Sequence, residues 1–123
     1  MLRRMRARLV RFGEIEIEGR TCAHDVVVDR GEVRKRRKGP SKERRAAYGH
    51  TPLTAAEEIP WGPRGSRLVV GTGADGMLPV DPDVVTEATR RGVEIVALPT
   101  DEACAELADV PFREARAILH VTC

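Results

Sequence analysis

The alternation of apolar and polar residues predicts a strand near the start of the chain. Residues 13–18 read Gly-Glu-Ile-Glu-Ile-Glu, an alternation typical of a half-buried strand with Ile15 and Ile17 facing the core. Three consecutive valines at 26–28 predict a second strand, and we expect the two strands to pair as an N-terminal β-hairpin.

Short apolar runs in the second half of the chain predict three further strands. They cover residues 67–70, 93–98 and 117–121, and each is bounded by Gly, Pro or polar residues. Runs this short without alternation are typical of strands that are buried on both faces of a sheet. We therefore expect the main sheet of the protein to be formed here.

Capping signals predict two helices between these strands. Asp81 can cap a helix that has Pro82 in its first position and ends at Gly92. Thr100 can cap the second helix, whose first turn is acidic. The apolar residues expected to face the core from the first helix are Val84, Val85 and Ala88.

A third, shorter helix is predicted at Thr54, because Glu57 follows three residues later as in a capping box. Pro and Gly residues at 60–65 then exclude regular structure up to the strand at 67–70.

The order strand, helix, strand, helix, strand predicts an α/β fold. Such an order requires at least one right-handed crossover and places the sheet between layers of other elements. With 123 residues the chain has the length of one domain, so we expect a single three-layer α/β domain over residues 1–123.

Composition excludes several classes of protein. Aromatic residues make up only 3%, too few for the stacking surface with which many proteins bind single-stranded nucleic acid. No apolar run approaches the roughly 18 residues that cross a membrane. The three cysteines have no close pairing, which favours a reducing compartment, so we expect a cytoplasmic protein. From the missing apolar run and the few aromatic residues, we expect neither a membrane nor a nucleic-acid partner.

The charge is unevenly distributed. Residues 1–50 hold 15 Lys and Arg against 7 Asp and Glu, whereas residues 51–123 hold 6 against 12. Residues 1–11 form a basic N-terminal segment, and residues 34–45 contain no apolar residue. We predict an exposed basic loop at 34–45, either solvated or binding an anion, an acidic protein or phosphates.

Glycines at 71, 73 and 76 follow the strand at 67–70 with the spacing of a dinucleotide-binding loop. No helix begins at Gly76, and the chain has no room for a second nucleotide-binding half, so we expect no cofactor. A tight turn or a small anion pocket fits better. If the neighbouring strands are parallel, Thr72, Asp75 and Thr100 share one crevice, which His120 joins only if the last strand is parallel too.

Together these features define a candidate ligand-binding set in which the glycine loop meets the basic loop. Its members are Gly71, Thr72, Gly73, Asp75, Gly76, Thr100, His50, Lys38 and Lys42. The histidines and cysteines lack ligand spacing, so no metal site is expected. The spacing of Ser, His and Asp residues likewise indicates no catalytic group, and His120 is interpreted as structural.

Six motifs in order resemble one family. They are FG-x-I-x-I-x-G, HDVVV, GHTPL, VVGTGADG, G-x-x-I-x-x-L-PT-x-E-A and ILHVTC, and they span Phe12 to Cys123. The chain resembles the small domain of the adipogenesis-associated domain-containing protein, which a mitochondrial complex I assembly factor shares.

The resemblance implies a central mixed sheet with one antiparallel strand, and no established reaction or cofactor. The positions it marks are Asp25, His50, Gly71, Gly73, Thr100, His120, Thr122 and Cys123. Residues 105–107 depart from the family, which often has Tyr-Asn there.

Two functions follow as expectations. The first is a non-catalytic module that binds a protein partner or assists assembly, which the resemblance and the uneven charge favour. The second is a small-molecule enzyme or anion-binding protein that uses the GTGADG loop and the basic loop. RNA binding is a weaker third hypothesis, and oligomers are possible.

Overall fold

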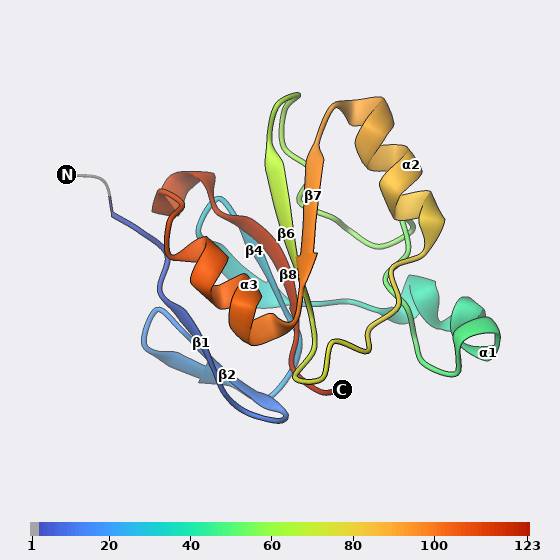
Figure 1. Ribbon diagram of the computed structural model, residues 1–123, viewed down its shortest axis with the longest axis horizontal. Coiled ribbons are helices and arrows are strands. Elements are labelled where there is room, and N and C mark those ends of the chain that lie inside the picture. Colours follow the sequence, from blue (N-terminus) through green and yellow to red (C-terminus); the bar gives the residue numbers. More distant parts are fainter. Residues whose placement is uncertain (1–2) are drawn as a thin grey trace.

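The computed structural model describes residues 3–123 and is built around a five-stranded mixed sheet (Figure 1). Its strand order is β5-β4-β8-β6-β7. β6, β7 and β8 are parallel, while β4 is antiparallel to both β8 and β5. β4 is thus the single strand that runs against the others, as the resemblance implies. The strands are β4 (Val26–Asp29), β5 (Glu32–Lys35), β6 (Arg67–Thr72), β7 (Glu94–Leu98) and β8 (Arg116–His120).

A second, three-stranded sheet is formed by the start of the chain, as β1 (Ala7–Arg11), β2 (Glu14–Ile17) and β3 (Arg20–Cys22). Ile15 and Ile17 are buried, which confirms the alternation. The predicted pairing of this strand with the valine strand is wrong, because β2 pairs with β1 and β3. The valines of β4 are buried on both faces, so this strand belongs inside the larger sheet.

The helix α2 (Pro82–Arg91) forms as predicted. The Asp81 side chain accepts a hydrogen bond from the backbone N–H of Asp83, and Gly92 ends the helix with φ +68°. The prediction that Val85 faces the core is wrong, since Val85 is 54% exposed. α2 buries only the narrow stripe of Val84 and Ala88, which are one helical turn apart.

Three other helical segments differ more from the prediction. They are η1 (Gly39–Arg44), α1 (Arg45–Tyr48) and η2 (Phe112–Glu114), none of which the pattern indicates. α3 (Thr100–Leu107) is present, but Pro99 occupies its cap position and Thr100 is its first residue. Thr100 does not cap the helix, because its hydroxyl bonds elsewhere in the core.

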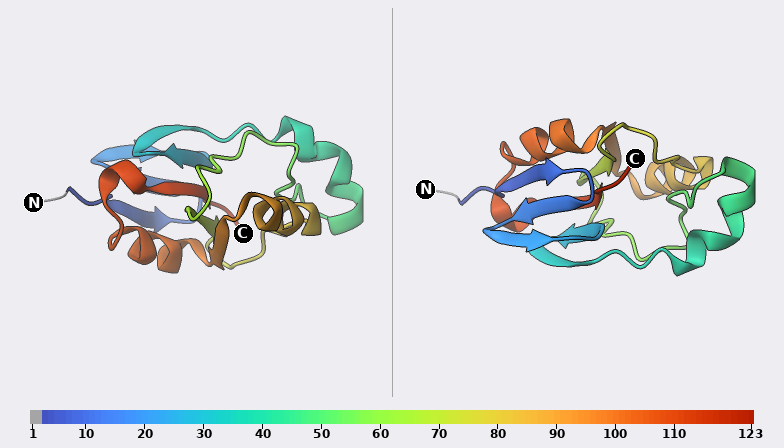
Figure 2. Two further views of the ribbon diagram at one scale, coloured as in Figure 1. Left: turned by 90° about the horizontal axis from the view of Figure 1, so that it is seen from above. Right: turned by 90° about the horizontal axis from the view of Figure 1, so that it is seen from below.

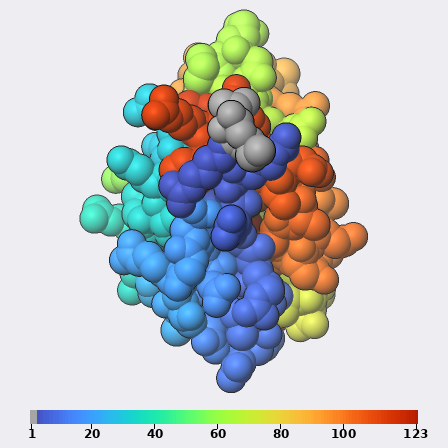
Figure 3. All heavy atoms as spheres, turned by 90° about the vertical axis from the view of Figure 1, so that its left-hand side faces the viewer, coloured from blue at the N-terminus to red at the C-terminus, as the bar shows by residue number. Residues whose placement is uncertain are grey.

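Two apolar cores lie on opposite faces of the large sheet and give the predicted three layers (Figure 2). α3 and the small sheet cover one face, and Figure 3 shows them side by side in orange and blue. α2 and the irregular segment 51–66 cover the other face. Alternate residues of β8 serve the two cores, with Leu119 on one side and Ile118 on the other. β7 is the outermost strand of the large sheet, next to β6, and it is only half-buried. This corrects the prediction of a buried strand.

Most residues of the basic stretch 34–45 are exposed, but the stretch contains regular structure and a buried arginine. Its first two residues end β5, residues 39–44 form η1, and Arg36 is only 4% exposed. The reason is that Arg36 pairs with buried carboxylates of Asp25 and Glu57. The same pairing explains why no helix begins at Thr54, since Glu57 turns toward Arg36 instead of back to a cap.

The basic N-terminal segment 1–11 contributes β1 to the small sheet and places Met5 in the core. Met1 and Leu2 lie outside the described residues. Over residues 3–123, the structure contains no helix with the length and apolar character needed to cross a membrane.

Candidate functional site

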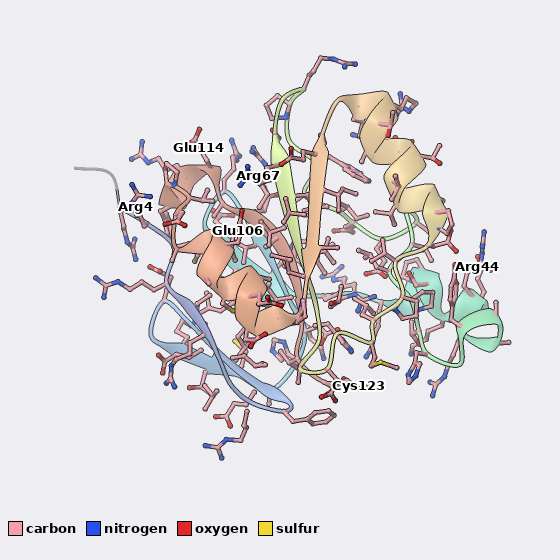
Figure 4. All side chains as sticks on the ribbon, viewed as in Figure 1. Arg4, Arg44, Arg67, Glu106, Glu114 and Cys123 are labelled. Atoms are coloured by element: carbon pink, nitrogen blue, oxygen red, sulfur yellow. The ribbon has the colours of Figure 1, made fainter. Side chains whose placement is uncertain are left out.

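The carboxyl ends of the three parallel strands meet at one edge of the large sheet. Thr72 at the end of β6 pairs with His120 at the end of β8, and β7 leads directly into Thr100. His120 therefore lies on the same edge as the glycine loop, a point that the sequence left open. The segment that follows β8 reaches this edge, where Figure 4 labels Cys123.

The glycine loop is held against its neighbours by its own backbone. The N–H of Gly73 donates to Oγ1 of Thr100 at 2.8 Å, and this hydroxyl donates to the carbonyl of His120 at 2.6 Å. The N–H groups of Ala74 and Met77 donate to the carbonyls of Thr122 and Cys123. These donors are engaged within the protein, so an anion at this edge would be bound by side chains.

Close packing accounts for the glycine at position 73. Its φ is +108°, and a Cβ atom there would lie 2.6 Å from the carbonyl oxygen of Thr122. A Cβ atom on Gly71 would lie 2.8 Å from Oγ1 of Thr100. Gly73 thus lets residues 122–123 approach the loop closely, and Gly71 lets Thr100 and Leu119 do so.

A pocket of about 190 Å³ opens beside this edge. It brings the predicted Lys38 and His50 together with His120, although these residues lie far apart in the sequence. The complete lining is Arg36, Lys38, Arg45, His50, Thr51, Met77, Leu78, His120, Thr122 and Cys123.

The other predicted site residues lie outside this lining. Lys42, Asp75 and Gly76 are exposed. Gly71, Thr72, Gly73 and Thr100 are buried and hold the loop and β8 in place. The structure therefore separates the predicted set into pocket residues, supporting residues and exposed residues.

A chain of hydrogen bonds runs from the buried Asp25 to the pocket. Oδ2 of Asp25 lies 2.7 Å from Nδ1 of His120, and Nε2 of His120 lies 3.1 Å from Oγ1 of Thr122. Burial alone would raise the pKa of Asp25. The hydrogen bond and charge of His120, the N–H of Val121 and the charge of Arg36 together lower that pKa to about 2.

The ionised Asp25 fixes the hydrogen on the imidazole of His120. A carboxylate can only accept, so Nδ1 carries the hydrogen and donates it to Asp25. In the neutral ring Nε2 then has a free lone pair, and the hydroxyl of Thr122 donates to it. This assignment follows from the partners of the ring nitrogens.

Arg36 holds Asp25, the first member of this hydrogen-bonded chain, in place. Its guanidinium donates to Asp25 at 2.9 Å, to both oxygens of Glu57 at 2.8 Å and to the carbonyl of Pro52 at 3.1 Å. Burial alone would lower the pKa of Arg36, but Glu57 and Asp25 raise it, so Arg36 is charged. One buried cation thus lies between two carboxylates.

The resemblance marks Asp25, His120 and Thr122, but sequence reasoning did not connect them into a hydrogen-bonded chain. The alternation along β8 and the residues after it puts His120 and Thr122 on one side, which was a usable signal. Asp25 lies 95 positions away and reaches His120 only through the pairing of β4 with β8. Among residues 3–123, no three His, Cys, Asp or Glu side chains are grouped as metal ligands.

Comparison with known proteins gives a family match and similar structures. The model of a family described as "Protein of unknown function (DUF498/DUF598)" matches residues 8–108. The crystal structure of the conserved hypothetical protein PH1505 from Pyrococcus horikoshii OT3 is 29% identical with a TM-score of 0.70, covering 97% of this chain and all (100%) of that one. A protein called MT938 is 26% identical with a TM-score of 0.65, covering 97% and 99%. No curated protein matches the chain.

Proposed function

This chain belongs to the DUF498/DUF598 family of proteins of unknown function, and we propose that it binds a small anionic molecule in the pocket beside the carboxyl ends of β6 and β8. The observation that supports the proposal most strongly is the charge of the lining. The lining contains Lys38 and Arg45 together with two histidines, and it contains no Asp or Glu side chain.

Lys38 and Arg45 differ from two other cations of the same stretch, Arg36 and Arg44. Arg36 and Arg44 form ion pairs with carboxylates. The described residues offer no such partner to Lys38 or Arg45, which are both exposed. Their charge is therefore available to a ligand at the mouth of the pocket.

Size limits the class of ligand. Pockets for drug-sized molecules usually measure roughly 300–1,000 Å³. The pocket measures about 190 Å³, which suits a phosphate, a sulfate or a short carboxylate rather than a nucleotide cofactor.

An NMR titration with inorganic phosphate tests this proposal. We expect saturable shifts of the amide signals at 50–51, 77–78 and 121–123. We expect Lys38→Gln to weaken phosphate binding about tenfold, equal to about 1.4 kcal/mol. The matched control is Lys42→Gln, which neutralises an exposed lysine of the same stretch outside the lining. Shifts spread over the whole basic surface, or equal effects of the two variants, would contradict the proposal.

The protein-binding or assembly role and the cytoplasmic location stay predictions. An acidic side chain of a partner could enter the same pocket, so the same two variants are useful there. A pull-down at moderate salt that recovers the same proteins with wild type and a charge-reversed 34–45 stretch would argue against a partner bound through this surface.

A further inference from the structure

We propose that the pocket is catalytic as well as anion-binding, with Asp25 and His120 activating the hydroxyl of Thr122 as a nucleophile. The substrate class is a small carboxylic ester that carries an anionic group. This inference rests on the proposed function, because the cations of the pocket would hold that group.

The geometry is that of an activated nucleophile, in which a base contacts the hydroxyl and a third group orients the base. His120 Nε2 lies 3.1 Å from Thr122 Oγ1, within reach for proton transfer. The Asp25 contact of 2.7 Å holds the ring from the other side. Asp25 is only 8% exposed, whereas Thr122 is half-buried and lines the pocket.

A purely structural role explains less of this arrangement. Asp25 already accepts hydrogen bonds from the N–H of Val121 and from Arg36, one on each oxygen. It therefore needs neither the imidazole nor the Thr122 hydroxyl to be satisfied. The extension of the chain to a partly exposed hydroxyl that faces a cationic pocket is the feature that indicates chemistry.

In the first half-reaction, Oγ1 of Thr122 attacks the ester carbonyl carbon while Nε2 of His120 takes its proton. The positive charge of the pocket lining as a whole favours the negative charge that develops on the carbonyl oxygen. The bond to the leaving alkoxide then breaks, and the proton on Nε2 passes to that alkoxide to give the alcohol. Thr122 is left as an ester.

Water completes the second half-reaction. Nε2 takes a proton from the water as its oxygen attacks the Thr122 ester. The bond to Oγ1 breaks, the proton on Nε2 returns to Oγ1, and the free acid is released. The enzyme is thereby restored, with one ester and one water converted to one acid and one alcohol.

Mono-4-nitrophenyl succinate is a suitable probe, because it is a small activated ester with a carboxylate. We expect wild type to release 4-nitrophenolate and to carry a succinyl group on Thr122, identified by mass spectrometry after an acid quench. Thr122→Val, which keeps the shape, should lower the rate at least about 100-fold.

Two further variants separate chemistry from folding. Thr122→Ser should restore the succinyl adduct, and Lys42→Gln should match wild type in rate. Equal rates for wild type and Thr122→Val, or an adduct on Cys123 in place of Thr122, would overturn the inference.

The phosphate titration separates this failure from that of the proposed function. If Lys38→Gln weakens phosphate binding and no acylation of Thr122 occurs, the pocket binds anions without catalysing. If phosphate does not bind and no acylation occurs, both proposals are wrong.

Discussion

The guanidinium of Arg36 meets the carboxylate of Glu57 through two parallel hydrogen bonds, Nε to Oε1 and Nη2 to Oε2, both 2.8 Å long. The two side chains are 1% and 3% exposed. This contact joins the end of β5 to the irregular segment 51–66, and it fixes where the basic stretch leaves the sheet. The wall of the pocket that carries Lys38 and His50 depends on it.

Replacing Glu57 by Gln should destabilise the protein by about 3–5 kcal/mol, because it leaves a buried guanidinium without its main counter-charge. Urea unfolding followed by circular dichroism measures the change. Glu58→Gln is the matched control, since the neighbouring Glu58 side chain is 70% exposed and should change stability by at most about 0.5 kcal/mol. Similar decreases in the unfolding free energy of the two variants would show that the buried Arg36–Glu57 pair contributes no more to stability than an exposed carboxylate.

Gly73→Ala should destabilise the protein by more than about 1 kcal/mol. The new Cβ would overlap the backbone of residues 122–123, and the φ of +108° is strained for any residue with a side chain. Thermal unfolding monitors the loss. Gly39→Ala, where a Cβ meets nothing within 4 Å, should be neutral or slightly stabilising. A stable Gly73→Ala variant would mean that the 122–123 segment can move away from the loop.

The contribution of Asp25 to stability should depend on pH. Its pKa is about 2 in the folded protein against an ordinary value of 3.8, so folding favours the ionised form. The stabilisation is present above about pH 4 and is lost as the pH falls through 2, and the shift corresponds to about 2 kcal/mol. The gap in unfolding free energy between wild type and Asp25→Asn should therefore shrink by about 2 kcal/mol between pH 6 and pH 2. A constant gap would contradict the low pKa.

Cys104 should resist thiol reagents in the folded protein. Burial and the charge of Asp101 raise its pKa to about 11, although a hydrogen bond with the backbone of Leu9 acts in the opposite direction. The thiolate is the reactive form, so its fraction near pH 8 falls about 100-fold below that of an ordinary cysteine. With Ellman's reagent we expect two fast thiols, the half-buried Cys22 and Cys123, and a third only after unfolding. Cys104→Ala should keep both fast thiols.

Local signals in the sequence predicted the elements whose causes are local. Asp81, Pro82 and Gly92 define α2 because cap, first turn and stop act within a few residues. The alternation at Ile15 and Ile17 predicted their burial for the same reason. The resemblance correctly implied the mixed sheet, which no spacing argument decided.

Errors arose where a distant partner determines the outcome. Arg36 looks like part of a solvated charge run until Asp25 and Glu57 are brought to it by folding. Thr100 looks like a cap until Gly73 and His120 approach its hydroxyl.

The pocket required the same kind of information. The sequence offered the proximity of Lys38 and His50 to the glycine-loop edge only as a hypothesis, and Lys42 and Asp75 fall outside the pocket lining.

The position of β8 has a consequence for the order of folding. β8 follows every other strand in the sequence, yet it lies in the middle of the large sheet between β4 and β6. While the chain is being synthesised, β4 and β6 have no common neighbour in the sheet until residues 116–120 are available. The pairing of β4 with β8 closes a loop that contains all the residues between these two strands. Closing so long a loop costs conformational entropy before the contacts between the strands are gained. We therefore expect the large sheet, and the pocket with it, to be completed only after β8 is in place, with slow folding as the kinetic signature.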